Sequence, residues 1–193
     1  SGVAQKLSMI MASVGGGNIA VALLIAAAGC IVLGMALPTV AAYIVAVILF
    51  VPTLTKLGVL PLAAHMFVFY FGIIAQITPP VCLASFTAAG IAEAESWKTG
   101  WTAFRYSLVA FLVPFVFVFR TEILLEGSLL QTLLTSLVVL GGTFFLACSV
   151  SGFLLVPIHS MPLRVVLLVC AVLIILPETT SSVIGFTGGF VLL

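Results

Sequence analysis

Long stretches without any charged side chain constrain this sequence more than any other feature. No Lys, Arg, Asp or Glu lies between Lys6 and Lys56, or between Lys56 and Glu93. Over the whole sequence 64% of the residues are hydrophobic and 6% are charged, whereas a soluble domain carries about 25% charged residues. Stretches of this length suit a lipid bilayer, where helices satisfy their own backbone hydrogen bonds. The sequence therefore predicts an all-α integral membrane protein.

Two short breaks at proline interrupt these apolar stretches. The first, residues 34–39, reads GMALPT, and the second, residues 76–80, reads QITPP. Unwound backbone at membrane depth is tolerated only inside protein or beside a water-filled cavity. Secondary transporters place their substrate and ion sites at such discontinuous helices. A proline kink without a binding function is the alternative interpretation for either break taken alone.

The segments on the two sides of the first break predict a re-entrant helical hairpin. Residues 19–33 and residues 39–51 are each shorter than the roughly 20 residues that a membrane-spanning helix needs. We expect the second segment to end at Pro52. Each segment is therefore either a half-helix or one arm of a re-entrant hairpin. We expect the hairpin, over residues 18–52, with its tip at residues 34–38 near the middle of the bilayer.

A discontinuous helix is expected next, over residues 61–92. Pro61 suits the first helical position, where its missing N–H is not needed. Together with the hairpin, this helix would make residues 1–92 part of a transport domain. A loop and a transmembrane helix follow in residues 93–126, and C-terminal transmembrane helices in residues 127–193. The three later spans are expected at residues 101–119, 129–155 and 163–176.

Two tryptophans, Trp97 and Trp101, flank the polar loop at residues 91–100. Tryptophans at such a place are typical of anchors at the membrane interface. The few basic residues fall on both predicted sides of the membrane, so the positive-inside rule does not fix the orientation.

The second break supplies groups that a cation and a carboxylate both need. Thr78 suits an N-cap and Pro79 suits the first helical position, so a half-helix beginning there would point its positive dipole end into the membrane. The preceding half-helix would leave carbonyls near Ala75 without intrahelical partners. Gln76 is the strongly polar side chain beside this break, with either a substrate or ion role or a helix–helix hydrogen bond. The pattern predicts cation-coupled carboxylate transport.

Several other classes lack the residues that they require. The sequence contains no Asp and no H-E-x-x-H motif, which excludes an aspartyl protease and a zinc protease of that type. The pairs Ser85 with His65 and Ser151 with His159 lie outside any nucleophile motif, so no enzyme is predicted. Neither broken segment contains a carboxylate, which favours sodium over proton coupling. The net charge of +1 gives no reason to expect a nucleic-acid partner.

Five segments resemble one known family. They are residues 33–43 (LGMALPTVAAY), 61–70 (PLAAHMFVFY), 77–81 (ITPPV), 95–101 (ESWKTGW) and 113–115 (VPF). Together they resemble the C-terminal part of the large, DctM-like permease subunit of tripartite ATP-independent periplasmic (TRAP) transporters. The likeness is strongest to the fused 4TM/12TM form that works with TAXI-type binding proteins.

The resemblance implies an elevator-type secondary transporter with two inverted repeats, of which this chain would carry most of the second. Its partners would be the missing N-terminal half of the same permease, membrane lipid, and a TAXI-type periplasmic substrate-binding protein that delivers the substrate. Uptake of organic acids across the inner (plasma) membrane of a bacterium or archaeon would be driven by an ion gradient, usually sodium. No cofactor is expected apart from sodium as the coupling ion. A non-transporting membrane scaffold or interaction protein is the alternative function.

The resemblance and the two breaks together name the expected site residues. Sodium would be bound at Gly34, Ala75, Thr78 and Val81, through backbone and the Thr78 hydroxyl. The residues expected near the substrate are Pro38, Thr39, Gln76, Pro79 and Pro80.

Overall fold

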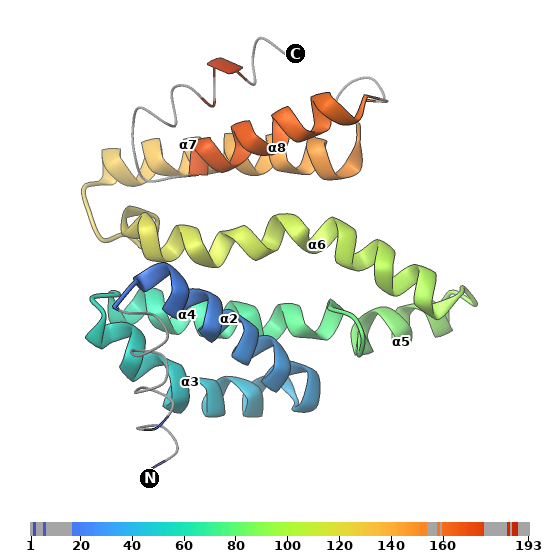
Figure 1. Ribbon diagram of the computed structural model, residues 1–193, viewed down its shortest axis with the longest axis horizontal. Helices are drawn as coiled ribbons and strands as arrows, with labels where there is room; N and C mark the ends of the chain where they lie inside the picture. The colour runs from blue at the N-terminus through green and yellow to red at the C-terminus, as the bar shows by residue number, and fades with distance from the viewer. Residues whose placement is uncertain are drawn as a thin grey trace. The chain divides into compact units, whose positions relative to one another are not determined.

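The computed structural model describes residues 2, 6, 17–153, 158, 160–175, 185, 187 and 188 (Figure 1). Helices form the fold in this part of the chain, which confirms the all-α prediction. The chain divides into two compact units, Ser1–Val118 and Phe119–Leu193, and each unit has its own packing.

Four helices among the described residues are long and apolar enough to cross a membrane. They are α2 (Ile19–Ala36), α3 (Thr39–Lys56), α6 (Ser96–Phe119) and α7 (Leu129–Ser151). Two shorter apolar helices are α4 (Pro61–Ile74) and α8 (Met161–Ile175). This set of helices is that of a multi-pass membrane protein.

The two arms of the hairpin are longer than the sequence predicts, with 18 residues each. α2 continues to Ala36, and α3 does not end at Pro52 but continues to Lys56. Pro52 donates no backbone hydrogen bond, and the Thr55 hydroxyl supports this last part of α3 by donating to the carbonyls of Val51 (3.0 Å) and Pro52 (3.1 Å). At 1.5 Å per residue each arm is about 27 Å long, close to the thickness of the hydrocarbon core.

The discontinuous helix consists of α4, the short 3-10 helix η1 (Ala75–Ile77), a turn at residues 78–82, and α5 (Leu83–Ile91). α4 begins at Pro61, as predicted, with the proline in the first helical position. The turn separates two helical pieces whose ends face the hairpin described above, and it therefore sets the place of the candidate site.

Small side chains let α2, α3 and α4 pack closely. Ala26 of α2, Ala46 of α3 and Ala63 of α4 are almost fully buried. At Gly29 of α2, an added Cβ would overlap the ring of Phe50 of α3. Because lipid tails are as apolar as the helices, close packing of this kind is what stabilises helix association in a membrane.

Aromatic rings join α4 to α6. Phe67 and Phe71 of α4 are buried, and the ring of Phe115 lies nearly perpendicular to both, with centroid distances of 5.3 and 5.8 Å. Near the start of α6, an added Cβ on Gly100 would lie 3.0 Å from the ring of Phe86 of α5. α6 therefore packs against both pieces of the discontinuous helix.

The second unit is built from η2 (Thr121–Leu124), α7 and α8, and the last two lie side by side (Figure 1). A capping box of Ser128 and Gln131 begins α7. Arg120 donates from Nη2 to the Ile174 carbonyl at 3.2 Å. Burial lowers the pKa of this guanidinium, and the neighbouring Glu122 carboxylate opposes the shift.

Three predicted span boundaries are wrong by a few residues. The span predicted over 129–155 ends at Ser151, because Gly152 adopts the left-handed conformation that closes many helices (φ 72°). The spans predicted from residues 101 and 163 begin earlier, at Ser96 and Met161. His159 lies outside the described residues.

We expect Gly152→Ala to destabilise the α7–α8 pair by about 2–4 kcal/mol. An alanine is strained at this φ, and its Cβ would overlap the guanidinium of Arg164, which donates from Nε to the Ile158 carbonyl at 2.9 Å. Thermal unfolding in detergent measures the effect. The loss should shrink in an Arg164→Ala background, and an equal loss in both backgrounds would mean that the contact with Arg164 contributes nothing.

Candidate functional site

The hairpin tip lies against the break in the discontinuous helix. Gln76 Nε2 donates to the carbonyl of Gly34 at 2.8 Å, with a longer contact of 3.5 Å to the carbonyl of Leu37. These residues are far apart in sequence, and one amide group links the end of α2 to η1. Gln76 thus makes the helix–helix hydrogen bond that the sequence offers as one of its two interpretations.

Gly34 allows this close approach. An added Cβ at Gly34 would lie 2.6 Å from the Cβ of Ala75 and 2.6 Å from the carbonyl oxygen of Gly72. Gly34 and Ala75 are both buried. The last turn of α2 therefore packs directly on the backbone of α4, and any side chain at position 34 would separate the two helices.

The break itself differs from the prediction in one respect. α5 begins at Leu83 and not at Pro79, and its N-cap is Cys82 in the left-handed conformation (φ 42°). Thr78 is not an N-cap, because its hydroxyl points back and donates to the carbonyl of Ile74 at 2.8 Å. Pro79 therefore stands in the turn and not at the first helical position.

Thr78 instead satisfies the end of α4. Besides the hydroxyl bond to Ile74, its backbone N–H donates to the carbonyl of Ala75 at 3.1 Å, and the side chain is buried. Two of the carbonyls that a helix end leaves without intrahelical partners are thereby paired. The break is a defined, internally bonded turn.

A cavity of about 640 Å³, the tip cavity, opens where the hairpin tip meets the break. Its walls come from the end of α2, the start of α3, η1 and the first turns of α5. The lining residues are Met35, Ala36, Leu37, Pro38, Thr39, Gln76, Leu83, Ala84 and Thr87. An anionic group in this cavity would lie beside the N-terminus of α5, where unpaired backbone N–H groups and the positive dipole end favour negative charge.

Comparison with known proteins identifies the family of this chain. A family model described as "Tripartite ATP-independent periplasmic transporter, DctM component" matches residues 1–132. The chain belongs to the DctM family. The match contains the hairpin, the break and α6, and it confirms the resemblance to the DctM family. No curated protein and no solved structure matches the chain. A DctM chain is a membrane permease of the TRAP type, and this family is not one of enzymes.

Three of the five predicted substrate-proximal residues of this DctM chain share the tip cavity: Pro38, Thr39 and Gln76. Pro79 and Pro80 do not line it, because they belong to the turn that precedes α5. Sequence reasoning did not find the cavity residues Leu83, Ala84 and Thr87. Thr87 follows Leu83 by four residues and Ala84 by three, and both spacings make side chains neighbours on a helix surface. That signal has meaning only once the start of α5 is known.

The four predicted sodium residues of this DctM chain lie at the junction of α2 with the break. Gly34 and Ala75 are in contact, and Thr78 and Val81 follow in the adjoining turn. The Gly34 carbonyl accepts from Gln76 and the Ala75 carbonyl accepts from Thr78. A carbonyl oxygen has a second lone pair, and a hydroxyl that donates its proton keeps two acceptor sites. Sodium binding at these positions stays a prediction.

The DctM chain also places one histidine within its helix bundle. His65 of α4 lies 3.0 Å, measured at Nδ1, from the hydroxyl of Tyr43 of α3. The ring of Tyr43 in turn meets Phe69 edge-on at 5.4 Å. This contact joins α3 to α4 away from the tip cavity and supports the packing role that the sequence favours for His65.

Proposed function

We propose that this permease chain takes up organic acids at the expense of a sodium gradient, with the tip cavity as the place where the carboxylate binds. The observation that carries the proposal is that the hairpin tip and the break in the discontinuous helix line one cavity, and that the Gln76 side chain bonds the break to the tip. Broken helices of this kind hold substrate and coupling ions in secondary transporters. Delivery by a periplasmic binding protein follows from the tripartite, periplasmic nature of the family. We propose a TAXI-type protein for that partner.

The carboxylate end of the substrate would lie at the first turn of α5. Cys82 gives this helix no side-chain cap, so backbone N–H groups at Leu83 and Ala84 remain as donors for an anion. The hydroxyl of Thr87 donates to the carbonyl of Leu83 at 2.8 Å and keeps its acceptor sites for a substrate hydroxyl. The remaining cavity wall is largely apolar and suits the carbon skeleton of an organic acid.

Sodium would bind beside this cavity, through the carbonyls of Gly34 and Ala75 and the hydroxyl of Thr78. A hard monovalent cation prefers oxygen ligands of this kind, and carbonyls in unwound backbone supply them in transporters. The N-terminal half of the permease would provide the first of the two inverted repeats. The site of action would be the inner membrane of a bacterium or archaeon.

We expect Thr78→Ala to raise the sodium concentration for half-maximal uptake about tenfold, because losing one hydroxyl ligand costs roughly 1–1.5 kcal/mol. Uptake of radiolabelled carboxylates into proteoliposomes that contain the complete transporter measures this effect. Thr78→Ser keeps the hydroxyl and should behave as the unchanged protein.

Thr87→Val is the matched control, since it removes a threonine hydroxyl from the tip cavity and leaves the predicted ion site unchanged. It should alter the concentration of carboxylate for half-maximal uptake and leave the sodium dependence unchanged. Unaltered sodium dependence in a folded, membrane-inserted Thr78→Ala protein would reject this ion site. Absence of any gradient-driven uptake by the unchanged complex would favour the scaffold alternative.

A further inference from the structure

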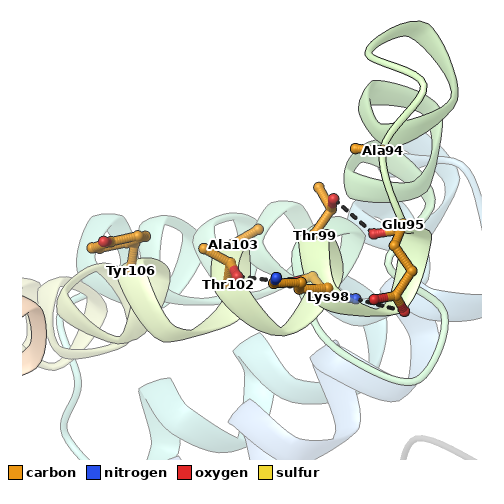
Figure 2. Close-up of a pocket in the computed structure, with 7 residues that line it drawn as sticks. All are labelled: Ala94, Glu95, Lys98, Thr99, Thr102, Ala103 and Tyr106. Carbon is orange, nitrogen blue, oxygen red and sulfur yellow. Dashed lines mark hydrogen bonds between the residues drawn. The ribbon is translucent and has the colours of Figure 1, made fainter.

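A second cavity, the interface groove, lies along the beginning of α6 and shares no residue with the tip cavity. Its volume is about 680 Å³. The lining residues are Ala94, Glu95, Lys98, Thr99, Thr102, Ala103 and Tyr106. Figure 2 shows Lys98, Thr99, Thr102, Ala103 and Tyr106 following one another along α6, with Glu95 just before the helix and Ala94 on the preceding segment.

The polar residues of the groove form two neighbouring rows on one side of α6. Lys98, Thr102 and Tyr106 are spaced four residues apart, and Glu95 and Thr99 form the adjacent row with the same spacing. The groove thus presents one cationic and one anionic side chain within a turn of each other. Its formal charge is balanced, as in a zwitterion.

The hydroxyls of Thr99 and Thr102 both donate their proton to a backbone carbonyl. The Thr99 hydroxyl donates to the carbonyl of Glu95 at 2.9 Å, and the Thr102 hydroxyl donates to the carbonyl of Lys98 at 2.7 Å (Figure 2). Each hydroxyl therefore serves a ligand only as an acceptor. The Glu95 carboxylate is also an acceptor, and within the part of the chain that the structure describes it receives a long contact of 3.4 Å from the backbone N–H of Lys98. Acceptors outnumber the single ammonium donor, so a ligand that donates hydrogen bonds fits this end of the groove.

Aromatic residues place the groove at the membrane interface. Trp97 and Trp101 are 52% and 55% exposed, and Tyr106 is 60% exposed, and such rings concentrate at the level of lipid headgroups. Tyr106 follows Lys98 by eight residues, which is about 12 Å along the helix. Beyond them, residues 108–119 contain no charged side chain. The groove therefore runs from the headgroup layer towards the hydrocarbon.

We propose that the interface groove binds a phospholipid whose headgroup carries both a primary ammonium and a phosphate, as phosphatidylethanolamine does. Glu95 and the threonine hydroxyls accept hydrogen bonds from the ammonium, and Lys98 pairs with the phosphate. The acyl chains pass Ala103 and Tyr106 towards the hydrocarbon. A choline headgroup has no N–H to donate, and a glycerol headgroup has no positive charge for Glu95.

Native mass spectrometry of the complete transporter tests this assignment. The protein is titrated with phosphatidylethanolamine, phosphatidylcholine and phosphatidylglycerol of identical acyl chains. We expect phosphatidylethanolamine to bind about threefold to fivefold more tightly than the other two, the range open to an exposed ion pair. Glu95→Gln should abolish this preference without weakening the binding of phosphatidylcholine. Lys98→Gln should weaken the binding of all three lipids.

Glu93→Gln and Lys56→Gln are matched controls, because they remove the same charges outside the groove. Both should bind the three lipids like the unchanged protein. Equal binding of the three lipids by the unchanged protein, or a preference that survives Glu95→Gln, would overturn the proposal. The proposal would also be overturned if Glu95→Gln and Lys98→Gln left lipid binding unchanged but weakened the complex with the periplasmic binding protein. The groove would then be a protein docking surface.

Discussion

Replacing Gly34 with alanine should reduce carboxylate uptake by about tenfold or more. The new Cβ would lie 2.6 Å from both the Cβ of Ala75 and the carbonyl oxygen of Gly72, and neither the backbone carbonyl nor the buried Ala75 can move without displacing α4. Overpacking of this kind costs about 1–3 kcal/mol. A cost of this size shifts the equilibrium between a packed and a separated hairpin tip by roughly 5-fold to 150-fold. The hairpin tip would separate from the break, and the tip cavity would lose its shape. Uptake by the complete transporter in proteoliposomes measures the loss.

Gly72→Ala is the matched control for that substitution. Gly72 belongs to the same contact, yet an added Cβ there meets no atom within 4 Å. Alanine also favours a helix over glycine by about 1 kcal/mol, so the control should keep full uptake and unfold at an equal or slightly higher temperature. If the two variants transported equally well, the close approach of Gly34 to α4 would have no functional importance.

Gln76→Leu should have the second-largest effect, for a different reason. It removes the donor that reaches the carbonyl of Gly34 at 2.8 Å and leaves that buried oxygen without this partner. An unsatisfied buried carbonyl costs about 1–3 kcal/mol, so we expect both a lower unfolding temperature in detergent and an uptake rate reduced by about tenfold. Gln76→Glu keeps the size of the side chain, but an ionised carboxylate cannot donate, and it should be impaired at least as strongly.

Thr87→Val separates this bridging role from a general change in the cavity wall. Thr87 lines the same cavity as Gln76, but its hydroxyl donates to the carbonyl of Leu83 in its own helix. This control should keep the unfolding temperature of the unchanged protein. Normal stability of Gln76→Leu would show that the amide does not hold the tip against the break.

Local signals in the sequence anticipated much of the fold. Long apolar stretches predicted membrane helices, and proline predicted where α3 and α4 begin, because its ring fixes φ and removes a donor irrespective of the surroundings. The family resemblance likewise rested on short segments such as residues 33–43 and 77–81. The predicted positions of the helix ends were less accurate. α3 continues through Pro52 to Lys56, and the Thr55 hydroxyl donates to the carbonyls of Val51 and Pro52 in this last part of the helix.

The role of individual residues at the break depended on what surrounds them. Thr78 suits an N-cap by its chemistry, but its hydroxyl turns back to the carbonyl of Ile74, and α5 begins only at Leu83. A threonine hydroxyl can satisfy either a helix start or a helix end, and the path of the following turn decides between them. The sequence therefore named a residue of the break correctly but placed it on the wrong helix.

By itself the sequence determined the class of protein, the two breaks and the family, because hydrophobicity and the constraints of proline act over a few neighbouring residues. Only the tertiary structure decided that Gln76 bridges to Gly34, that Pro38 and Thr39 share a cavity with α5, and that Pro79 and Pro80 stay outside it. These relations join segments about 40 residues apart. They exist only because the small side chains of α2, α3 and α4 let the helix backbones approach closely enough for one amide to reach across.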